Sequence, residues 1–179
     1  MGQEIEAKFT ITSDGWRGQG RAVEIKQGYL STTKERTVRV RLKGDKAFLT
    51  IKGAPDGIVR REFEYSIPVD DARTMLAELC EGTIIDKTRY VVDHEGATWE
   101  IDAFHGDNDG LLFAELEVDS IATFERVLAE HKPPWIGERL DDARYTNAEL
   151  ARHPFSLWSN KLSPEGDLSP EQDLSPEEK

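Results

Sequence analysis

The sequence predicts an α+β fold, built as a closed antiparallel β-barrel of about eight strands with a charged interior and with helices packed on its outside. Three observations predict it. Apolar and polar residues alternate with a period of two along most of the chain before residue 119, turn residues stand between the alternating segments, and the polar face of nearly every segment carries charges of one sign. Only two longer amphipathic helical patterns interrupt the strands.

The clearest strand is Thr37-Val-Arg-Val-Arg-Leu-Lys43, in which valine and leucine share one face while arginine and lysine share the other. The same alternation predicts strands over residues 3–11, 22–31, 47–53, 61–68, 85–93, 97–104 and 111–118. Several junctions carry turn residues, such as Gly44-Asp45 and Glu95-Gly96. Short connections of this kind favour antiparallel pairing of neighbouring strands.

Two helices are predicted from capping residues and apolar spacing. One begins with Asp70 as its N-cap and runs to Leu79, and the other begins with Ser120 and runs to Leu128. A shorter third helix is expected from Thr146 to about Arg152. The apolar faces of the strands could pack outward against the helices while the charged faces point inward, so we expect the helices on the outside of the barrel.

The folded domain is expected to cover residues 1–160, with an acidic tail over residues 161–179. The tail contains Leu-Ser-Pro-Glu three times, starting at Leu162, Leu168 and Leu174. A six-residue repeat is also compatible with a β-helix turn or a docking peptide, but a proline in every copy and the scarcity of apolar surface favour a disordered tail.

Composition narrows the class of protein. The net charge of −12 argues against nonspecific binding to nucleic acid or to anionic membranes, which requires clustered bases. No apolar run approaches the ~20 residues that span a bilayer, and the acidic start of the chain is unlike a signal peptide. We therefore expect a cytoplasmic protein. The single Cys80 excludes an intramolecular disulfide framework.

The sign-sorted charges are the most informative feature for function. Any one strand could simply present a solvated face, but side chains at i and i+2 lie only ~6.6–7 Å apart along a strand, so repeated pairs of like charge repel one another. A bound ligand or metal would compensate them. The charged faces are Glu4/Glu6/Lys8, Arg39/Arg41/Lys43, Lys52, Glu62/Glu64, Lys87/Arg89, Glu100/Asp102 and Glu115/Glu117.

If these faces point inward, they line a narrow wet tunnel, because a closed sheet of about eight strands has room inside for side chains or one small ligand. Clustered carboxylates suit a hard cation such as Mg²⁺ or Mn²⁺, whereas arginine and lysine suit phosphoryl oxygens. A metal-bound polyphosphate satisfies both sets of charges.

The residues also resemble a known family. Glu4-Ile-Glu-Ala-Lys8 matches the ExExK signature of the CYTH or triphosphate tunnel metalloenzyme superfamily. Further segments follow in the family order through about residue 152: Gln27-Gly-Tyr-Leu30, Arg39-Val-Arg41, Thr50-Ile-Lys52, Arg61-Glu-Phe-Glu64, Lys87-Thr-Arg-Tyr90, Glu100-Ile-Asp102, Glu115-Leu-Glu117, Pro134-Trp-Ile-Gly137 and Arg144-Tyr-Thr-Asn147.

This resemblance implies roles for the charged residues. The implied metal ligands are Glu4, Glu6, Asp102, Glu115 and Glu117, with Glu62, Glu64 and Glu100 as second-tier candidates. The implied phosphate-binding residues are Lys8, Arg39, Arg41, Lys52, Lys87 and Arg89. Lys43, at its strand end, is expected to face solvent. If Lys52 lies beside Tyr29, it could lower the pKa of the phenol, and the pair would then activate the attacking water.

The resemblance implies metal-dependent hydrolysis of a small triphosphate, and short chains of this kind resemble the inorganic triphosphatases. Class IV adenylate cyclases carry a His-Phe pair ahead of ExExK, whereas only three residues precede Glu4 here. Nucleoside and thiamine triphosphatases stay open, as does a noncatalytic module that binds polyphosphate or nucleotide. Related proteins often form dimers, so a homodimer is possible.

Overall fold

A computed structural model describes residues 4–33 and 35–158 of the chain, and of Glu4 it describes the backbone only. The predicted domain end at Asn160 and the predicted tail over residues 161–179 lie outside the described residues. Of the helices in the described part, none is both long and apolar enough to cross a membrane.

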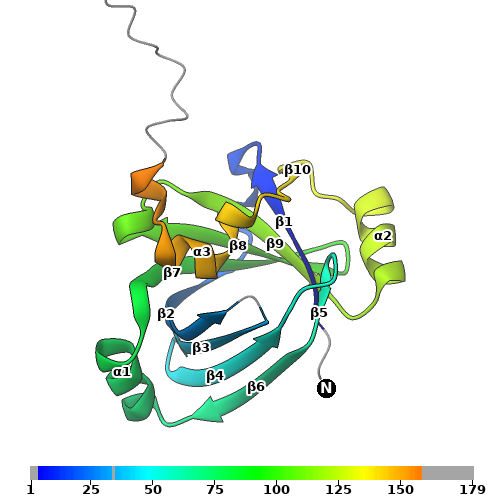
Figure 1. Ribbon diagram of the computed structural model, residues 1–179. Helices are drawn as coiled ribbons and strands as arrows, with labels where there is room; N and C mark the ends of the chain where they lie inside the picture. Colours follow the sequence, from blue (N-terminus) through cyan, green and yellow to red (C-terminus); the bar gives the residue numbers. More distant parts are fainter. Residues whose placement is uncertain (1–3, 34, 159–179) are drawn as a thin grey trace, which may run out of the picture.

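Ten antiparallel strands form one sheet that curls into a nearly closed barrel (Figure 1). In chain order they are β1 (Glu4–Ile11), β2 (Arg21–Thr33), β3 (Arg36–Lys43), β4 (Lys46–Gly53), β5 (Val59–Arg60), β6 (Glu62–Ile67), β7 (Glu81–His94), β8 (Ala97–His105), β9 (Leu112–Val118) and β10 (Ile136–Arg139). Their spatial order is β10-β1-β9-β8-β7-β2-β3-β4-β6, and β5 pairs with β1.

The barrel closes through β5. This strand pairs with the start of β1, with Glu4 opposite Arg60 and Ile5 opposite Val59, and a single residue, Arg61, separates it from β6 at the far end of the sheet. The predicted antiparallel barrel is thus confirmed. The predicted strand number was too low, because β5 and β10 are only two and four residues long and are too short to produce an alternating pattern.

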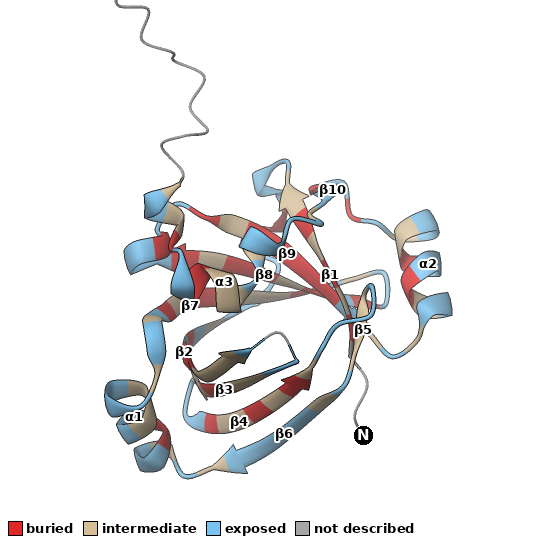
Figure 2. Cartoon of the chain, viewed as in Figure 1, coloured by how far each residue is buried: buried red, intermediate tan, exposed pale blue. Residues whose placement is uncertain are grey.

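The apolar core lies mainly outside the barrel wall, between the strands and the helices packed on them. Figure 2 shows many of the buried residues along β8 and β9. Trp99 on β8 lies opposite Leu116 on β9, and both are fully buried. Helix α2 (Ile121–Glu130) covers them with Phe124 and Val127. Helix α1 (Val69–Glu78) similarly brings Ala72, Met75 and Leu76 against β3 and β4. The outer face of β6 is less well covered, since Phe63 and Tyr65 are 44% and 56% exposed.

The helix caps confirm one prediction and correct another. The Ser120 side chain accepts a hydrogen bond from the Thr123 backbone N–H at 3.1 Å, as expected of an N-cap. Asp70 is not the N-cap of α1, because Pro68 starts that helix earlier. Proline has φ fixed near the helical value, and Asp70 then lies in the first turn, where the helix dipole stabilises an acidic side chain.

A third helix, α3 (Asn147–Arg152), lies across one end of the barrel, and Thr146 caps it through the Glu149 backbone N–H. Its Leu150 and Ala151 pack with Tyr29 and Phe113. Four short 3-10 turns complete the described chain: Asp14–Trp16, Gly106–Asn108, Ala143–Tyr145 and Phe155–Leu157.

Gly82 determines how closely α3 approaches β7. It has φ of +71°, and a Cβ atom placed on it would lie 2.4 Å from the backbone oxygen of Ala151. The same oxygen accepts a hydrogen bond from the Thr83 hydroxyl. No side chain can therefore be added at Gly82 without moving α3.

We expect Gly82→Ala to lower the free energy of unfolding by more than Gly44→Ala does. Both positions have positive φ, which costs a non-glycine residue about 1–2 kcal/mol, but Gly44 faces open space. The additional loss of stability at Gly82 then measures the cost of the clash between the new methyl group and the backbone of α3. Urea unfolding of the two variants measures these free energies. Equal losses of stability in both would contradict the close packing of α3 against Gly82.

Candidate active site

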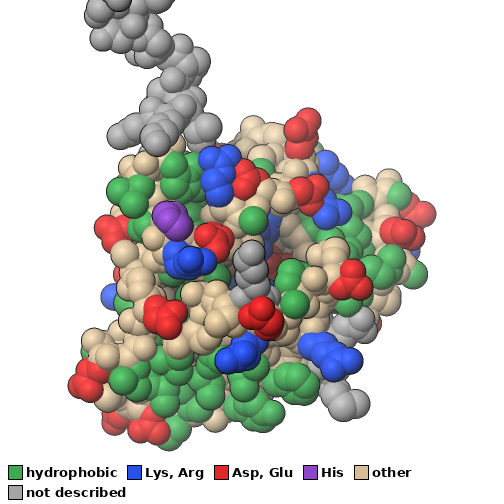
Figure 3. All heavy atoms as spheres, in the orientation of Figure 1, with side chains coloured by type: hydrophobic (Ala, Val, Ile, Leu, Met, Phe, Trp, Pro, Cys, Tyr) green, Lys and Arg blue, Asp and Glu red, His purple; other side chains and the backbone are tan. Residues whose placement is uncertain are grey.

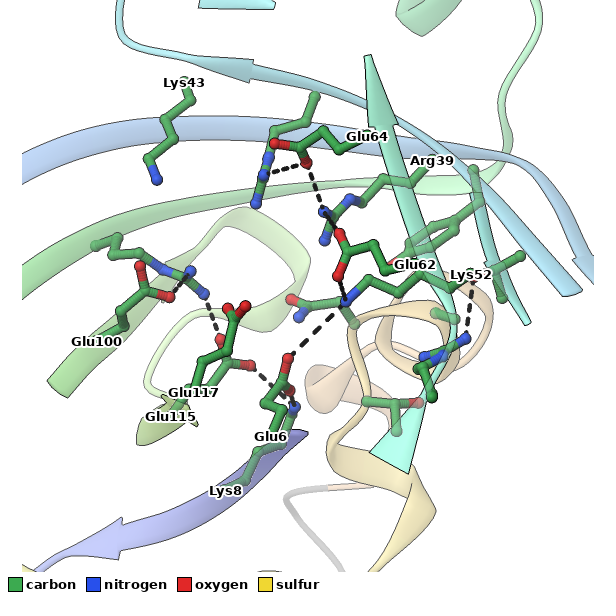
Figure 4. Close-up of a pocket in the computed structure, with 18 residues that line it drawn as sticks. Glu6, Lys8, Arg39, Lys43, Lys52, Glu62, Glu64, Glu100, Glu115 and Glu117 are labelled. Carbon is green, nitrogen blue, oxygen red and sulfur yellow. Dashed lines mark hydrogen bonds and ion pairs between the residues drawn. The ribbon is translucent and has the colours of Figure 1, made fainter. Parts of the chain in front are cut away.

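The barrel encloses a cavity of about 400 Å³, lined by inward-facing side chains from the strands and by the start of α3 (Figure 4). Of the described residues, seven lysines and arginines and six glutamates line it. The positive and negative charges of the lining are therefore almost balanced. A ligand that carries only negative charge would not require so many carboxylates around it. The basic residues are Lys8, Arg39, Arg41, Lys43, Lys52, Arg60 and Arg89, and the acidic ones are Glu6, Glu62, Glu64, Glu100, Glu115 and Glu117.

The β3 wall of the cavity carries two of the four arginines in the described lining. On β3, Arg39 and Arg41 point inward from alternating positions, and both approach Glu64 on β6, at 3.6 and 2.7 Å. Burial and the neighbouring charge of Arg39 lower the pKa of Arg41 to about 10, so its guanidinium is still charged at neutral pH. The wall thus presents fixed positive charges that are only partly neutralised by the adjacent strand.

Lys43 belongs to the same wall. We expected it to face solvent, but it lines the cavity at the other end of the β3 series, where Figure 4 shows it above Glu100. Burial lowers the pKa of its ammonium group, although Glu100 partly opposes this. The prediction was wrong because the end of a strand is not the end of the barrel: β2 continues beside it and pairs Ile25 with Lys43.

Strands β7 and β8 carry a fully buried ion-pair cluster. Asp102 on β8 accepts hydrogen bonds from Arg89 Nε at 2.7 Å and from Lys87 Nζ, both on β7. Although burial would raise the pKa of Asp102, Arg89 and Lys87 hold it at about 2. Because two cations share this carboxylate, burial and Arg89 lower the pKa of Lys87 to about 8. Arg89 also contacts Glu100 and Glu115, so it is held from three sides.

The predicted residues Lys87 and Asp102 therefore lie behind the cavity wall, with exposures of 1% and 0%. Lys87 Nζ also lies 3.3 Å from the Asn147 side-chain oxygen on α3. The structure gives Asp102 a supporting position that orients Arg89 toward the cavity.

Acidic side chains gather where β1 meets β9. Glu6 and Glu117 are direct partners across these strands, and Lys8 and Glu115 form the next inward-facing pair. Glu115 lies 2.9 Å from Lys8 Nζ. Burial alone would lower the pKa of Lys8, but Glu115 and Glu6 raise it above its ordinary value. By contrast, burial and the charges of Glu6, Glu100 and Glu62 raise the pKa of the Glu117 carboxyl.

Tyr29 lines the cavity near α3, and burial raises the pKa of its phenol to about 12, although Arg39, Lys8 and Arg60 act in the opposite direction. The expected lowering of this pKa is therefore wrong. Lys52 Nζ lies 3.4 Å from Glu62 and 3.9 Å from Glu6, so it forms ion pairs with both carboxylates. Tyr29 is a neutral hydrogen-bonding group at physiological pH.

The donor chemistry fits a hard divalent cation. Glu6 and Glu117 are direct partners across β1 and β9, and burial together with the charges of Glu6, Glu100 and Glu62 raises the pKa of the Glu117 carboxyl. A hard cation bound by these carboxylate oxygens would relieve that repulsion. Within the described part of the chain, no group of three or more His, Cys, Asp or Glu side chains is already arranged to hold a metal ion. Several of the carboxylates instead contact lysine or arginine.

The fold brings together all the predicted site residues except three. Lys87 and Asp102 lie behind the wall, and the side chain of Glu4 is outside the described residues. Sequence reasoning missed Thr37, Arg60, Thr146, Asn147 and Ala148. Arg60 and Thr37 had a signal, since each continues the alternation of an inward-facing series by two residues. Thr146 and Asn147 lie in the segment Arg144-Tyr-Thr-Asn147 that matches the family, but no strand alternation placed them at the cavity, and Ala148 had no signal.

The fold and the cavity define a tunnel-type antiparallel barrel with a charged interior. The chain belongs to the CYTH domain family, whose model matches residues 2–141. It is 44% identical over 157 residues to the inorganic triphosphatase of Acetivibrio thermocellus, covering 87% of this chain and 97% of that protein. It is 36% identical over 151 residues to the inorganic triphosphatase of Nitrosomonas europaea, covering 83% and 96%.

A solved structure agrees with these relationships. The crystal structure of the inorganic triphosphatase NE1496 superposes with a TM-score of 0.60 at 34% identity, covering 83% of this chain and 93% of that one. A putative adenylyl cyclase from Hippeastrum shares the fold at 16% identity, with a TM-score of 0.55. The barrel is thus a family scaffold.

We expect Glu117→Gln to raise the stability of the metal-free protein at pH 7.5. The substitution removes a charge directly opposite Glu6, and such a like-charge pair costs about 0.2–1 kcal/mol. The pKa of the Glu117 carboxyl is raised, so its ionised form is unfavourable in the fold above that pKa, and the gain should shrink as pH falls and the carboxyl takes up its proton.

Glu115→Gln is the matched control, since Glu115 lies two residues away on the same face but pairs with Lys8 and Arg89. It should lower the melting temperature, because it leaves two buried cations without this partner. Thermal unfolding with chelator at pH 7.5 and pH 4 measures both variants. A loss of similar size in the two at pH 7.5 would show that Glu117 is not under like-charge strain.

Proposed function

We propose that this protein hydrolyses inorganic triphosphate to pyrophosphate and orthophosphate with Mg²⁺ or Mn²⁺. The observation that carries the proposal is the nearly balanced set of inward-facing cations and carboxylates in one cavity, which suits a polyanion accompanied by a metal. The names of the two relatives and their coverage of the whole barrel support the same activity.

In this proposal the arginines and lysines bind the phosphoryl oxygens. Arg39 and Arg41 come from β3, Arg89 from β7 and Lys8 from β1, so a phosphate chain in the cavity would be contacted from several strands of the barrel. Lys52 lies between Glu62 and Glu6 and reaches toward the centre of the cavity. Phosphoryl transfer mainly requires the protein to position the phosphate chain and to stabilise its charge, and fixed cations around the chain do both.

The carboxylates divide into two groups. Glu6 and Glu117, with Glu4 and Glu115, are the residues we propose for holding the metal, while Asp102, Glu62, Glu64 and Glu100 keep the cations in position through the contacts described above. A bound Mg²⁺ or Mn²⁺ would supply charge neutralisation at the phosphoryl oxygens.

Hydrolysis forms one bond from the water oxygen to phosphorus and breaks one phosphoanhydride bond, and the protons of the water end on the products or in solvent. The charge that develops on the departing oxygen is balanced by the guanidinium and ammonium groups of the wall. Because burial raises the pKa of Tyr29 to about 12, its phenol is protonated at neutral pH, so in this proposal it orients the water through its hydroxyl instead of taking up a proton. Lys52, beside the carboxylates, binds the phosphoryl group.

The lining favours inorganic triphosphate over larger substrates. Among the described lining residues Tyr29 is the only aromatic side chain, and the cavity offers little apolar surface to a nucleobase or a thiazole ring. Adenylate cyclase, nucleoside triphosphatase and thiamine triphosphatase activities are therefore the alternatives to be tested, together with binding of polyphosphate or nucleotide without catalysis.

Three further expectations stay predictions: a cytoplasmic location, a possible homodimer, and an acidic tail outside the folded domain.

Phosphate release tests the proposed function directly. Purified protein with Mg²⁺ or Mn²⁺ should release orthophosphate fastest from triphosphate, and more slowly from ATP, thiamine triphosphate or pyrophosphate, without forming cyclic AMP from ATP. Metal dependence is checked with chelator. If no triphosphate gives metal-dependent phosphate release, the hydrolase proposal is wrong.

We expect Arg41→Gln to lower kcat/KM for triphosphate roughly 10- to 100-fold, since a hydrogen bond to a charged group is worth about 1.5–3 kcal/mol. Arg36→Gln on the same strand is the control, because Arg36 is exposed and outside the cavity lining. Steady-state phosphate release compares the two. Equal activity in both variants would remove Arg41 from the binding set.

A further inference from the structure

Arg60 lies on the inner surface of the barrel where the two ends of the sheet meet. It belongs to the two-residue strand β5 and continues the inward-facing series of Glu62 and Glu64 on β6. Arg61, between the strands, points the other way and is exposed. The alternation therefore places one additional cation in the cavity, beyond those implied by the family resemblance.

The contacts of Arg60 differ from those of the other arginines in the cavity. Its Nε donates to the Gly53 backbone oxygen at 3.1 Å, and Nη2 donates to the Thr37 hydroxyl at 3.3 Å. Both partners are neutral. Whereas Arg39, Arg41 and Arg89 each contact glutamates, no carboxylate among the described side chains forms an ion pair with Arg60. Its Cα partner, Glu4, is described by its backbone only.

Arg60 also stands where the main cavity meets a second one. A side cavity of about 290 Å³ shares Glu6, Lys8, Arg60 and Thr146 with the main cavity. Its outer lining includes Pro55, Gly57 and Asp141, which are all exposed. The two cavities therefore share part of their walls, and the side cavity is open to solvent at its outer lining. The space-filling view shows a hollow on this face of the molecule with basic and acidic side chains in and around it (Figure 3).

Arg60 lies at one end of the cavity wall, at the level of Lys52, which is the cross-strand partner of Thr37. From Lys43 to Thr37, the β3 series spans six residues, roughly 20 Å at ~3.3–3.4 Å per residue. Arg60 is bonded to Thr37, so it lies at the end opposite Lys43, near Tyr29. The lowering effect of Arg60 on the pKa of Tyr29 agrees with this closeness.

We propose that Arg60 is a phosphate-binding residue that holds the phosphoryl group at the α3 end of the substrate, at the junction of the main and side cavities. The inference rests on the proposed function for the identity of the substrate. The neutral partners hold the guanidinium in place, while its charge is available to an oxyanion. The side cavity lets orthophosphate reach the same position from solvent.

Kinetics and binding together test this role. Arg60→Gln should raise KM for triphosphate roughly tenfold with a smaller change in kcat, and it should raise the inhibition constant of orthophosphate by a similar factor. Arg60→Lys keeps the charge and should fall between Arg60→Gln and the unmodified protein. Arg61→Gln removes the neighbouring exposed charge and should change neither constant by more than about twofold.

A binding measurement separates this inference from the proposed function. Triphosphate with Mn²⁺ should raise the melting temperature of the unmodified protein and of Arg61→Gln, and should do so less for Arg60→Gln. If triphosphate is not hydrolysed but this difference persists, the proposed function fails and the role of Arg60 stands. If Arg60→Gln and Arg61→Gln show the same KM, phosphate inhibition and thermal shift, the role of Arg60 is refuted. A folded Arg60→Lys still decides the matter should Arg60→Gln fail to fold.

Discussion

The structure depends on one constraint: charged side chains that occupy the inside of a closed sheet must be neutralised there. Because each strand alternates, turning the charged faces inward turns the apolar faces outward, so the core has to form between the barrel wall and the helices packed on it. Trp99 and Leu116 under α2, and Val40 and Ala47 under α1, are the result. The arrangement is the reverse of a soluble barrel that hides apolar residues in its interior.

Neutralisation inside the barrel is achieved by contacts between neighbouring strands. Arg89 touches carboxylates from β8 and β9, and Glu64 on β6 touches two arginines of β3. A ligand carrying only negative charge would compete with these carboxylates for the arginines and leave the acids unpaired. A phosphate chain with its own cation replaces both members of each pair, which explains why the site contains so many acids beside a polyanion.

Features that depend on residues close together in the sequence could be predicted, whereas features that depend on contacts between distant segments could not. Period-two alternation predicted the long strands and nearly all the inward-facing charges, because it is a local property. The short strand β5 could not be predicted as a strand, because it forms by pairing with β1, which is distant in the sequence. The position of Asp102 required knowing that Lys87 and Arg89 both reach it from the adjacent strand. The prediction that Lys43 faces solvent was wrong because the end of β3 does not coincide with the end of the barrel. The α3 residues became part of the site only through packing against Tyr29 and Phe113.

The closure of the barrel through β5 has a mechanical consequence. Among the described residues, two cross-strand pairs and a backbone hydrogen bond from Glu6 to Ile58 join the ends of the sheet there, whereas β1 and β9 share five pairs and β4 and β6 share six. The circumference can therefore widen at this seam without breaking a long ladder of hydrogen bonds, and the residue that rides on the seam is an arginine facing the interior. Parting the barrel at this seam would break fewer backbone pairs than parting it between β1 and β9 or between β4 and β6.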